Sequence, residues 1–433
     1  MAQFLFTAIG SYGDVHPTVG LGRALLARGH RVKLISNPYY EDLVTSSGLE
    51  FVPLGTREAY LKLSRHPDMW HPTRAMVLAM RTTSAQLREL YDLLIANYLP
   101  DETVFCAHTS DAASHVVAEK LGQPLASIVL APAVLWSRYA SPRVKGAALG
   151  KGVPRWLKQL QCWAAGQMFV SRFVGPSLKS LRAEVGLPRV KSGVLCNWLN
   201  KSELILGLFP AWFAPPQPDW PAATVLTGFP LWDSNDDDSL PDDLLEFLEA
   251  GSPPIAFCPG SANHRGHQFF EAAVEACERL GRRGILLTKY AHQLPAKLPD
   301  SVRHFGFLPM SKLLPRSAAL VHHGGIGSLS QAMVAGIPHI VRPMAFDQFD
   351  NALRLRQLGV GRELSISRFS GPSAAGALAA LLDSPSVAAR CRQLAARCDG
   401  PTALSAACDA LEQLANSRLA AGRSTVSSVP AYT

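Results

Sequence analysis

A glycine-rich stretch beside two histidines is the clearest chemical feature of this sequence. Residues 321–328 read Val-His-His-Gly-Gly-Ile-Gly-Ser and lie between a short apolar run and a helical pattern. Glycines let a backbone approach a ligand closely, and the free N–H groups at a helix N-terminus attract anions. With His323 and Ser328 as further donors, the stretch predicts a pyrophosphate cradle that needs no metal. It matches neither a Walker A loop nor Gly-x-Gly-x-x-Gly, and a tight strand–helix turn is the simpler alternative.

An Asp-Gln pair follows about twenty residues later, at Asp347 and Gln348. The carboxylate only accepts hydrogen bonds, whereas the amide both donates and accepts, so together they suit the hydroxyl groups of a sugar. An aspartate at such a place also commonly caps a helix, and the pair alone is a weak motif. Combined with the glycine-rich stretch at this spacing, it predicts a site for a sugar that carries a diphosphate.

With these motifs the chain resembles, over nearly its whole length, the family 1 nucleotide-sugar glycosyltransferases, which include antibiotic, sterol, plant-metabolite and rhamnolipid transferases. The resemblance implies an inverting enzyme with an α/β fold of GT-B type, in which two Rossmann-like domains face each other across a cleft. It also implies a nucleobase stacked on an aromatic ring, a diphosphate on the glycine-rich stretch and a sugar on the Asp-Gln pair. The donor-binding residues it implies are Gly13, Ser261, Phe307, His323, Gly325, Gly327, Ser328, Asp347 and Gln348.

The catalytic base is also implied by the resemblance. Residues 10–17 read Gly-Ser-Tyr-Gly-Asp-Val-His-Pro, the pattern of the antibiotic and sterol members, which places the base at Asp14. A carboxylate there could take the proton of an acceptor hydroxyl as that hydroxyl attacks the anomeric carbon. His16 is the rival base and otherwise an acceptor-binding residue, and His108 is the expected partner of Asp14.

Within the family, residues 209–221 and 227–230 are most similar to the rhamnosyltransferases of rhamnolipid synthesis. That likeness implies a metal-independent hexosyltransferase without a cofactor, using dTDP-L-rhamnose and a 3-(3-hydroxyalkanoyloxy)alkanoate lipid. Residues 55–200 look different and should shape the acceptor pocket, with Trp136 as an expected contact. The alternatives are transfer from UDP-glucose to another lipophilic acceptor (a glucolipid, sterol or polyketide) and a nucleotide-sugar epimerase of the same architecture.

Alternating strand and helix patterns supply the elements that must position these residues. Such alternation predicts βαβ units and parallel sheets, which bind ligands at the carboxyl ends of their strands. The expected strands of the first half are 4–9, 32–36, 104–107 and 125–130, and those of the second half are 255–258, 285–288, 319–322 and 339–342. The expected helices include one after Pro17 and those over 111–121, 269–280, 328–335 and 386–414.

Proline-rich and acidic segments mark the expected domain boundaries. We expect an acceptor-binding domain over 1–222, a linker over 223–245, a donor domain over 246–400, a helix over 401–420 packing back on the first domain, and a tail over 421–433. The linker contains Asp236-Asp237-Asp238, an Asp-x-Asp pattern that binds a metal in another transferase class. We interpret it as a solvated loop and expect no metal site.

Composition excludes several other classes of protein. The 433 residues are 48% hydrophobic and 18% charged, without a long apolar stretch, a secretory signal or paired cysteines, which favours a reduced, cytoplasmic globular protein. The net charge of +8 is concentrated in residues 138–191, which contain eleven Lys or Arg and one acidic residue. Nucleic acid is therefore not the expected partner.

Trp156, Leu160 and Trp163 lie at i, i+4, i+7 spacing within that basic segment. A basic helix with tryptophans suits a membrane surface or an anionic, greasy ligand. Peripheral association with the inner face of the membrane is therefore an open expectation. The alternative is an ordinary surface helix whose apolar stripe packs on the core.

Overall fold

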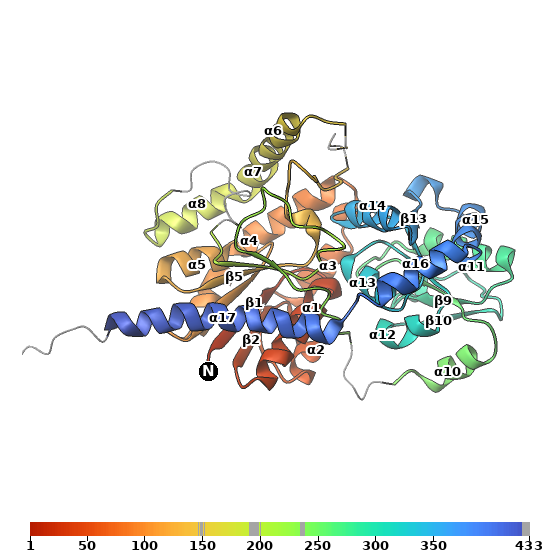
Figure 1. Ribbon diagram of the computed structural model, residues 1–433, viewed down its shortest axis with the longest axis horizontal. Coiled ribbons are helices and arrows are strands. Elements are labelled where there is room, and N and C mark those ends of the chain that lie inside the picture. Colours follow the sequence, from red (N-terminus) through yellow and green to blue (C-terminus); the bar gives the residue numbers. More distant parts are fainter. Residues whose placement is uncertain are drawn as a thin grey trace, which may run out of the picture.

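The structure is a computed structural model that describes residues 1–145, 147, 150, 152–189, 199, 201–233 and 239–426, with backbone only for 169 and 418–426. Within these residues the chain forms two parallel β-sheets, one in each half, flanked by helices (Figure 1). Residues Asp236–Asp238 lie outside the described residues, as does the tail from 427 onward.

The first sheet has seven strands in the order β3-β2-β1-β4-β5-β6-β7. The strand order reverses between β1 and β4, and an open parallel sheet binds its ligand at such a switch point. Asp14 follows β1 and His108 ends β4, so both lie at this switch point. The bounds are β1 Gln3–Ala8, β2 Arg31–Ser36, β3 Glu50–Pro53, β4 Thr103–His108, β5 Leu125–Val129, β6 Leu204–Gly207 and β7 Thr224–Leu226.

The second sheet has six strands in the order β10-β9-β8-β11-β12-β13. Its order reverses between β8 and β11, which places the Gly260-Ser261 turn and the 323–328 stretch side by side. The bounds are β8 Ile255–Cys258, β9 Gly284–Leu287, β10 Val302–Phe305, β11 Ala319–His322, β12 His339–Val341 and β13 Gly361–Glu363.

Helices cover both faces of each sheet. In β1, Phe4 and Phe6 belong to one buried cluster while Leu5 belongs to another, the alternation expected of a strand buried on both sides. The first half contains α1 Tyr12–Ala27, α2 Glu41–Ser46, α3 Arg57–Ser64, α4 Arg74–Asn97, α5 Ala113–Leu121, α6 Arg155–Ala165, α7 Ser171–Phe173 and α8 Gly175–Glu184, with a π-helical turn at Gly166–Val170. The second half contains α10 Asp242–Glu249, α11 His267–Leu280, α12 Met310–Leu313, α13 Ile326–Val334, α14 Gln348–Leu358, α15 Gly371–Leu382, α16 Pro385–Ala395 and α17 Gly400–Val426.

Helix α17 crosses back to the first half of the molecule (Figure 1). It packs on α1, β4 and β6, and Arg28 at the end of α1 forms ion pairs with Asp409 and Glu412 of α17. The segment expected to be helical over 386–414 forms two helices, α16 and α17. The break arises because Asp399 accepts hydrogen bonds from Thr402 and caps the start of a new helix.

Two local expectations differ from the structure. Helix α1 begins at Tyr12 rather than after Pro17, because Ser11 caps it and forms a capping box with Asp14. Pro17 therefore lies inside the helix, and Gly13 and Asp14 lie in its first turn. The first sheet also extends into the segment expected as a linker, since β7 pairs with β6 at residues 224–226.

Candidate active site

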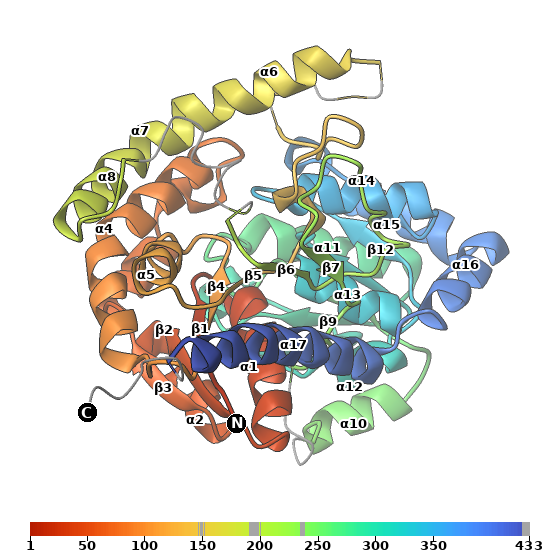
Figure 2. The same cartoon turned by 60° about the vertical axis from the view of Figure 1, so that its left-hand side comes forward.

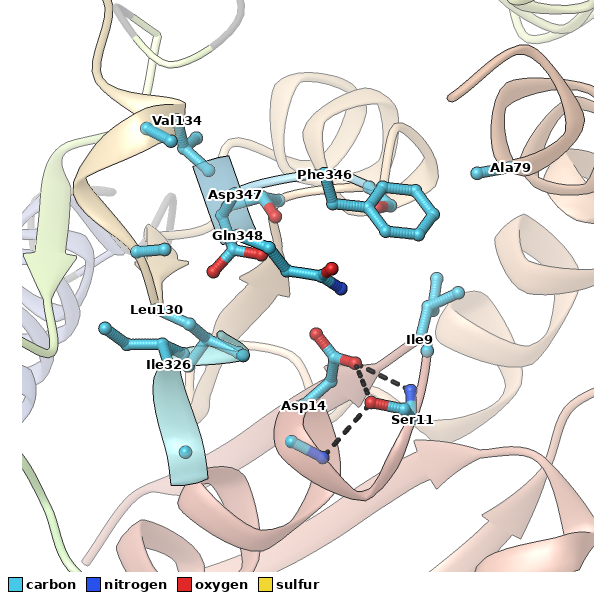
Figure 3. A pocket seen from close by; sticks show the side chains of 18 of the residues that line it. Ile9, Ser11, Asp14, Ala79, Leu130, Val134, Ile326, Phe346, Asp347 and Gln348 are labelled. Atoms are coloured by element: carbon cyan, nitrogen blue, oxygen red, sulfur yellow. Dashed lines mark hydrogen bonds between the residues drawn. The ribbon is translucent and has the colours of Figure 1, made fainter. Parts of the chain in front are cut away.

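A cavity of about 1330 Å³ lies between the two halves of the molecule and is lined by both (Figure 3). Every site residue predicted from the sequence lines this cavity. The first half contributes Gly13, Asp14, His16, His108 and Trp136, and the second contributes Ser261, Phe307, His323, Gly325, Gly327, Ser328, Asp347 and Gln348. The fold therefore brings together residues from across the chain, and what they do depends on the local geometry.

The glycine-rich stretch forms the start of α13, with Gly325 as the N-cap. No side chain of the described residues caps this helix, so its first N–H groups remain available to an anion at the cavity wall. The ring of His323 lies between Gly260 and Gly325, where an added Cβ would stand 3.2 Å from Cε1 and 2.5 Å from Nε2, respectively. Glycine is therefore needed at both positions. Burial lowers the pKa of His323 to about 4, which leaves the imidazole neutral near pH 7.

Gln348 is held by the backbone of its own loop. Its side-chain oxygen accepts hydrogen bonds from the backbone N–H groups of Met344 and Ala345, at 2.8 and 3.0 Å. Because those two donors require an oxygen, the amide nitrogen of Gln348 is the group that faces the cavity above Asp14 (Figure 3). Gln348 can therefore donate hydrogen bonds to a sugar hydroxyl.

Asp347 is tied to the glycine-rich stretch by Asn351, a residue that the sequence analysis missed. The Asn351 amide nitrogen donates to Asp347 Oδ2 at 2.7 Å and to the backbone oxygen of Gly324 at 2.9 Å. Burial, with a smaller contribution from the nearby Asp14 carboxylate, raises the pKa of Asp347 to about 7. The preceding Phe346 has a φ of 55°, a left-handed conformation that is rare outside glycine and is often found at ligand-binding loops.

Asp14 and His108 form a direct pair. His108 Nε2 lies 3.3 Å from Asp14 Oδ1, and the Ser110 backbone N–H donates to His108 Nδ1 at 3.2 Å. Nδ1 is thus an acceptor, so the proton of a neutral ring lies on Nε2, which donates to Asp14. The other carboxylate oxygen of Asp14 accepts from the Ser11 backbone N–H at 2.6 Å (Figure 3). Asp14 therefore both caps α1 and points into the cavity.

A buried network fixes the end of β4 behind this pair. The His108 backbone N–H donates to the Thr7 hydroxyl at 2.9 Å, and that hydroxyl donates to Asp111 Oδ2 at 2.8 Å. The Ser114 hydroxyl donates to the same oxygen at 2.5 Å. Asp111 is fully buried, and burial raises its pKa. These contacts hold β1 and β4 in register at the point where Asp14 and His108 meet.

An aromatic cluster lines another part of the cavity. Phe307 is 46% exposed, and its ring centroid lies 5.7 Å from that of Tyr12 and 6.1 Å from that of His16. Lys289, which the sequence analysis missed, donates to the Tyr12 hydroxyl at 3.0 Å and lies 5.2 Å from the Phe307 ring centroid. His16 also contacts Trp232, and burial lowers its pKa to about 4. His16 thus lies beside the expected nucleobase-stacking ring rather than apart from it.

The remaining wall of the cavity is apolar with a few cationic groups. Trp70, Met76, Met80, Val134, Leu135, Trp136, Cys162, Ala165 and Val170 contribute to it. Lys158 on α6 also lines the cavity although it is only 6% exposed, and it forms no ion pair or hydrogen bond with the described residues. Arg143 contributes too, but it is paired with Glu363. This wall can accommodate an elongated apolar molecule that carries a negative charge.

The described residues contain neither a metal-binding cluster nor a membrane-spanning helix. No group of three or more His, Cys, Asp or Glu side chains within them is arranged to hold a metal ion. None of their helices combines the length and apolar character required to cross a bilayer.

Two Rossmann-like domains that share one cleft define the GT-B architecture. Comparison with solved structures agrees: a glycosyltransferase of kitacinnamycin matches with a TM-score of 0.72 and 22% identity, covering 95% of this chain and 98% of that one. A Streptomyces glycosyltransferase, SsfS6, solved with thymidine diphosphate, matches with a TM-score of 0.62 and 20% identity over 95% of this chain and all of that one.

Sequence comparisons identify the family. Residues 4–136 match the glycosyltransferase family 28 N-terminal domain, and residues 283–410 match the C-terminal domain of proteins like erythromycin biosynthesis protein CIII. Glycosyltransferase GtfC of Amycolatopsis orientalis is 30% identical over 87% of this chain and 90% of its own length. The O-mycaminosyltylonolide 6-deoxyallosyltransferase of Streptomyces fradiae is 28% identical over 95% of this chain and 97% of its own. The chain belongs to this family of two-domain glycosyltransferases.

Proposed function

We propose that this enzyme transfers a sugar from a nucleoside-diphosphate donor to the hydroxyl of a lipophilic acceptor, with inversion at the anomeric carbon. The observation that carries the proposal is the convergence of three groups on one cavity. These are the uncapped start of α13, the Asp347–Gln348 pair and the carboxylate of Asp14.

The donor would lie along the second domain. Its base would stack on the exposed ring of Phe307, and its diphosphate would accept hydrogen bonds from the start of α13, including Gly327 and Ser328, and from the turn at Ser261. Lys289, close to Phe307, adds a positive charge at this end of the cavity. A thymidine diphosphate bound in one structural neighbour and the 6-deoxyallose named for one relative support a nucleotide-linked sugar donor. Within that class the proposal takes dTDP-L-rhamnose as the donor.

The reaction would be a single displacement. The acceptor oxygen attacks the anomeric carbon, the bond from that carbon to the diphosphate oxygen breaks, and the hydroxyl proton passes to Asp14. His108 would orient the Asp14 carboxylate through its Nε2–H group. The negative charge that builds on the diphosphate would be stabilised by the helix start and by neutral His323. This displacement draws on no metal ion, and metal-independent transfer is part of the proposal.

The acceptor would occupy the apolar wall near Trp136, with Lys158 facing its negative group. A 3-(3-hydroxyalkanoyloxy)alkanoate combines the features that this wall suits: a free hydroxyl, alkyl chains and a carboxylate. His16, first expected at the acceptor, is better assigned to the nucleobase end, because it contacts Phe307. A lipid of this kind partitions into bilayers, so the proposal includes peripheral association with a membrane.

Two other activities remain as alternatives. UDP-glucose could replace dTDP-L-rhamnose, and the product would then be a glucolipid or the glucoside of a sterol or polyketide. No predicted donor residue distinguishes the two sugars at the 6-position. A nucleotide-sugar epimerase would bind the same donor without an acceptor. The extended apolar wall favours transfer over epimerisation, since an epimerase has no use for it.

The test is a direct assay with the purified protein. It is incubated with a hydroxyalkanoyloxy-alkanoate and either dTDP-L-rhamnose or UDP-glucose, with and without a chelator, and the products are analysed by mass spectrometry. We expect a rhamnolipid from the first donor in both conditions. If product formed only from UDP-glucose, the transferred sugar would be glucose and not rhamnose. Loss of product with chelator would refute metal independence. Nucleotide release without acceptor would favour the epimerase.

A further inference from the structure

Helix α6 exposes large apolar side chains and turns a lysine inward, which is the reverse of the usual arrangement in a surface helix. Its inward face, with Lys158, Cys162 and Ala165, lines the cavity. Its outward face carries Trp156, Leu160 and Trp163, which are 66%, 49% and 58% exposed. The alternative in which this stripe packs on the core is therefore wrong. Figure 2 shows α6 along the outer edge of the molecule, in line with α7 and α8.

The apolar stripe continues past the end of α6. Met168, which is 64% exposed, lies in the π-helical turn Gly166–Val170. A π-helix has more residues per turn than an α-helix, so the five-residue step from Trp163 keeps Met168 near the same side of the helix. We call Trp156, Leu160, Trp163 and Met168 the α6 face. Four large apolar side chains exposed in one row mark an interaction surface rather than scattered exposure.

The charge around the α6 face indicates what it contacts. The sequence from Arg155 to Ala183 contains no Asp or Glu. Arg155, Arg172 and Lys179 within that stretch are exposed. Tryptophan prefers the boundary between water and hydrocarbon, and cations beside it are attracted to anionic headgroups. An anionic bilayer complements exposed tryptophans within a stretch that carries exposed cations and no acid.

We infer that the α6 face docks on an anionic lipid bilayer and holds the cavity next to the membrane. The helix would lie in the plane of the interface, with the α6 face toward the acyl chains and Lys158 toward the cavity. An acceptor lipid could then enter the apolar wall beside α6 without crossing water. The inference builds on the proposed lipid acceptor, because it names where that acceptor comes from.

Vesicle binding by the full-length protein tests the inference. The variant is Trp156→Gln, Leu160→Gln and Trp163→Gln together, and the matched control is Leu26→Gln with Ile366→Gln, two apolar residues exposed elsewhere. Co-sedimentation is measured with phosphatidylcholine vesicles, with and without about one third phosphatidylglycerol. We expect the wild type and the control to bind the anionic vesicles, more weakly as salt rises, and the triple variant to bind at least about tenfold more weakly.

Other outcomes would overturn the inference. Equal binding by the triple variant would remove the α6 face as the docking surface, and equal binding to neutral vesicles would refute the charge argument. If the wild type formed a dimer and did not bind vesicles, and the triple variant lost the dimer, the α6 face would instead contact a second copy of the chain. Vesicle binding is measured without donor or acceptor, so a protein that binds vesicles but transfers no sugar would refute only the proposed function.

Discussion

His108 Nε2 lies 3.3 Å from Asp14 Oδ1, although the two residues are 94 positions apart in the chain. They meet because β1 and β4 are paired neighbours, so that the first turn of α1 and the end of β4 stand side by side. The pair joins a carboxylate that faces the cavity to an imidazole whose Nε2–H points at it. This arrangement leads to the first two predictions.

Replacing Asp14 with Asn should remove the proposed proton acceptor while keeping the side-chain shape. We expect kcat to fall by roughly 10²–10⁴-fold, the usual contribution of a general base, with the Kd for the donor little changed. Steady-state glycolipid formation and donor titration calorimetry measure the two quantities. Because Asp14 also caps α1, thermal unfolding of the variant must be recorded as well. Near-normal turnover would show that Asp14 is not the base.

His108 should act through Asp14 as a positioning residue. His108→Gln keeps a hydrogen-bond donor near Asp14 Oδ1, whereas His108→Ala removes it. We expect the Ala variant to lose activity and to shift the acidic limb of the pH–rate profile, with the Gln variant recovering part of the activity. If both variants lost activity equally and the pH profile did not change, His108 would have only a structural role.

Asp347 should make stability depend on pH. Its pKa is raised to about 7 in the folded protein, so the folded state keeps a proton that the unfolded chain loses near pH 4. The free energy of unfolding should therefore fall as pH rises from about 4 to about 7 and change little from this group above that. Asp347→Asn removes the dependence, so the variant should gain stability relative to the wild type over this range. If the free energy of unfolding changed with pH in the same way for both proteins, the raised pKa would be contradicted.

Gly325→Ala should weaken donor binding, because the added Cβ would stand 2.5 Å from His323 Nε2 and force that ring or the start of α13 to move. We expect the donor Kd to rise by at least about tenfold. Gly376→Ala is the matched control: this helical glycine has open space around its Cβ position, so the change should be neutral or stabilising by up to about 1 kcal/mol. Unchanged donor affinity in Gly325→Ala would argue against the diphosphate site.

Lys158→Met should affect only acceptors that carry a negative charge. We expect the acceptor KM to rise by about tenfold for a hydroxyalkanoyloxy-alkanoate and to stay the same for an uncharged lipophilic alcohol. Lys179→Met, an exposed cation of the same basic segment, serves as the control and should change neither value. Equal effects of Lys158→Met on both acceptors would refute a contact between Lys158 and the carboxylate.

Local patterns in the sequence were enough to predict much of the architecture. Strands β8 and β11 lie at the residues expected, and the two-sheet fold is confirmed, because strand and helix periodicity reflect backbone preferences within a few residues. The start of α1 was placed too late, because Ser11 and Asp14 form a capping box that begins the helix before Pro17. The glycine-rich stretch and the Asp-Gln pair were recognisable because each is contiguous and bears its own chemistry.

Contacts between distant segments appear only in the tertiary structure. Asn351 joins Asp347 to Gly324, and Lys289 lies over Tyr12, but neither has a local signature, since lone amides and lysines are common on any surface. The helical spacing of Trp156, Leu160 and Trp163 predicted a stripe without telling which way it faces. The sequence by itself determined the elements and the two local motifs, because these depend on neighbouring residues. The pairing of Asp14 with His108 and the exposure of the α6 face were decided by packing, because strand order and helix orientation arise from interactions across the whole chain.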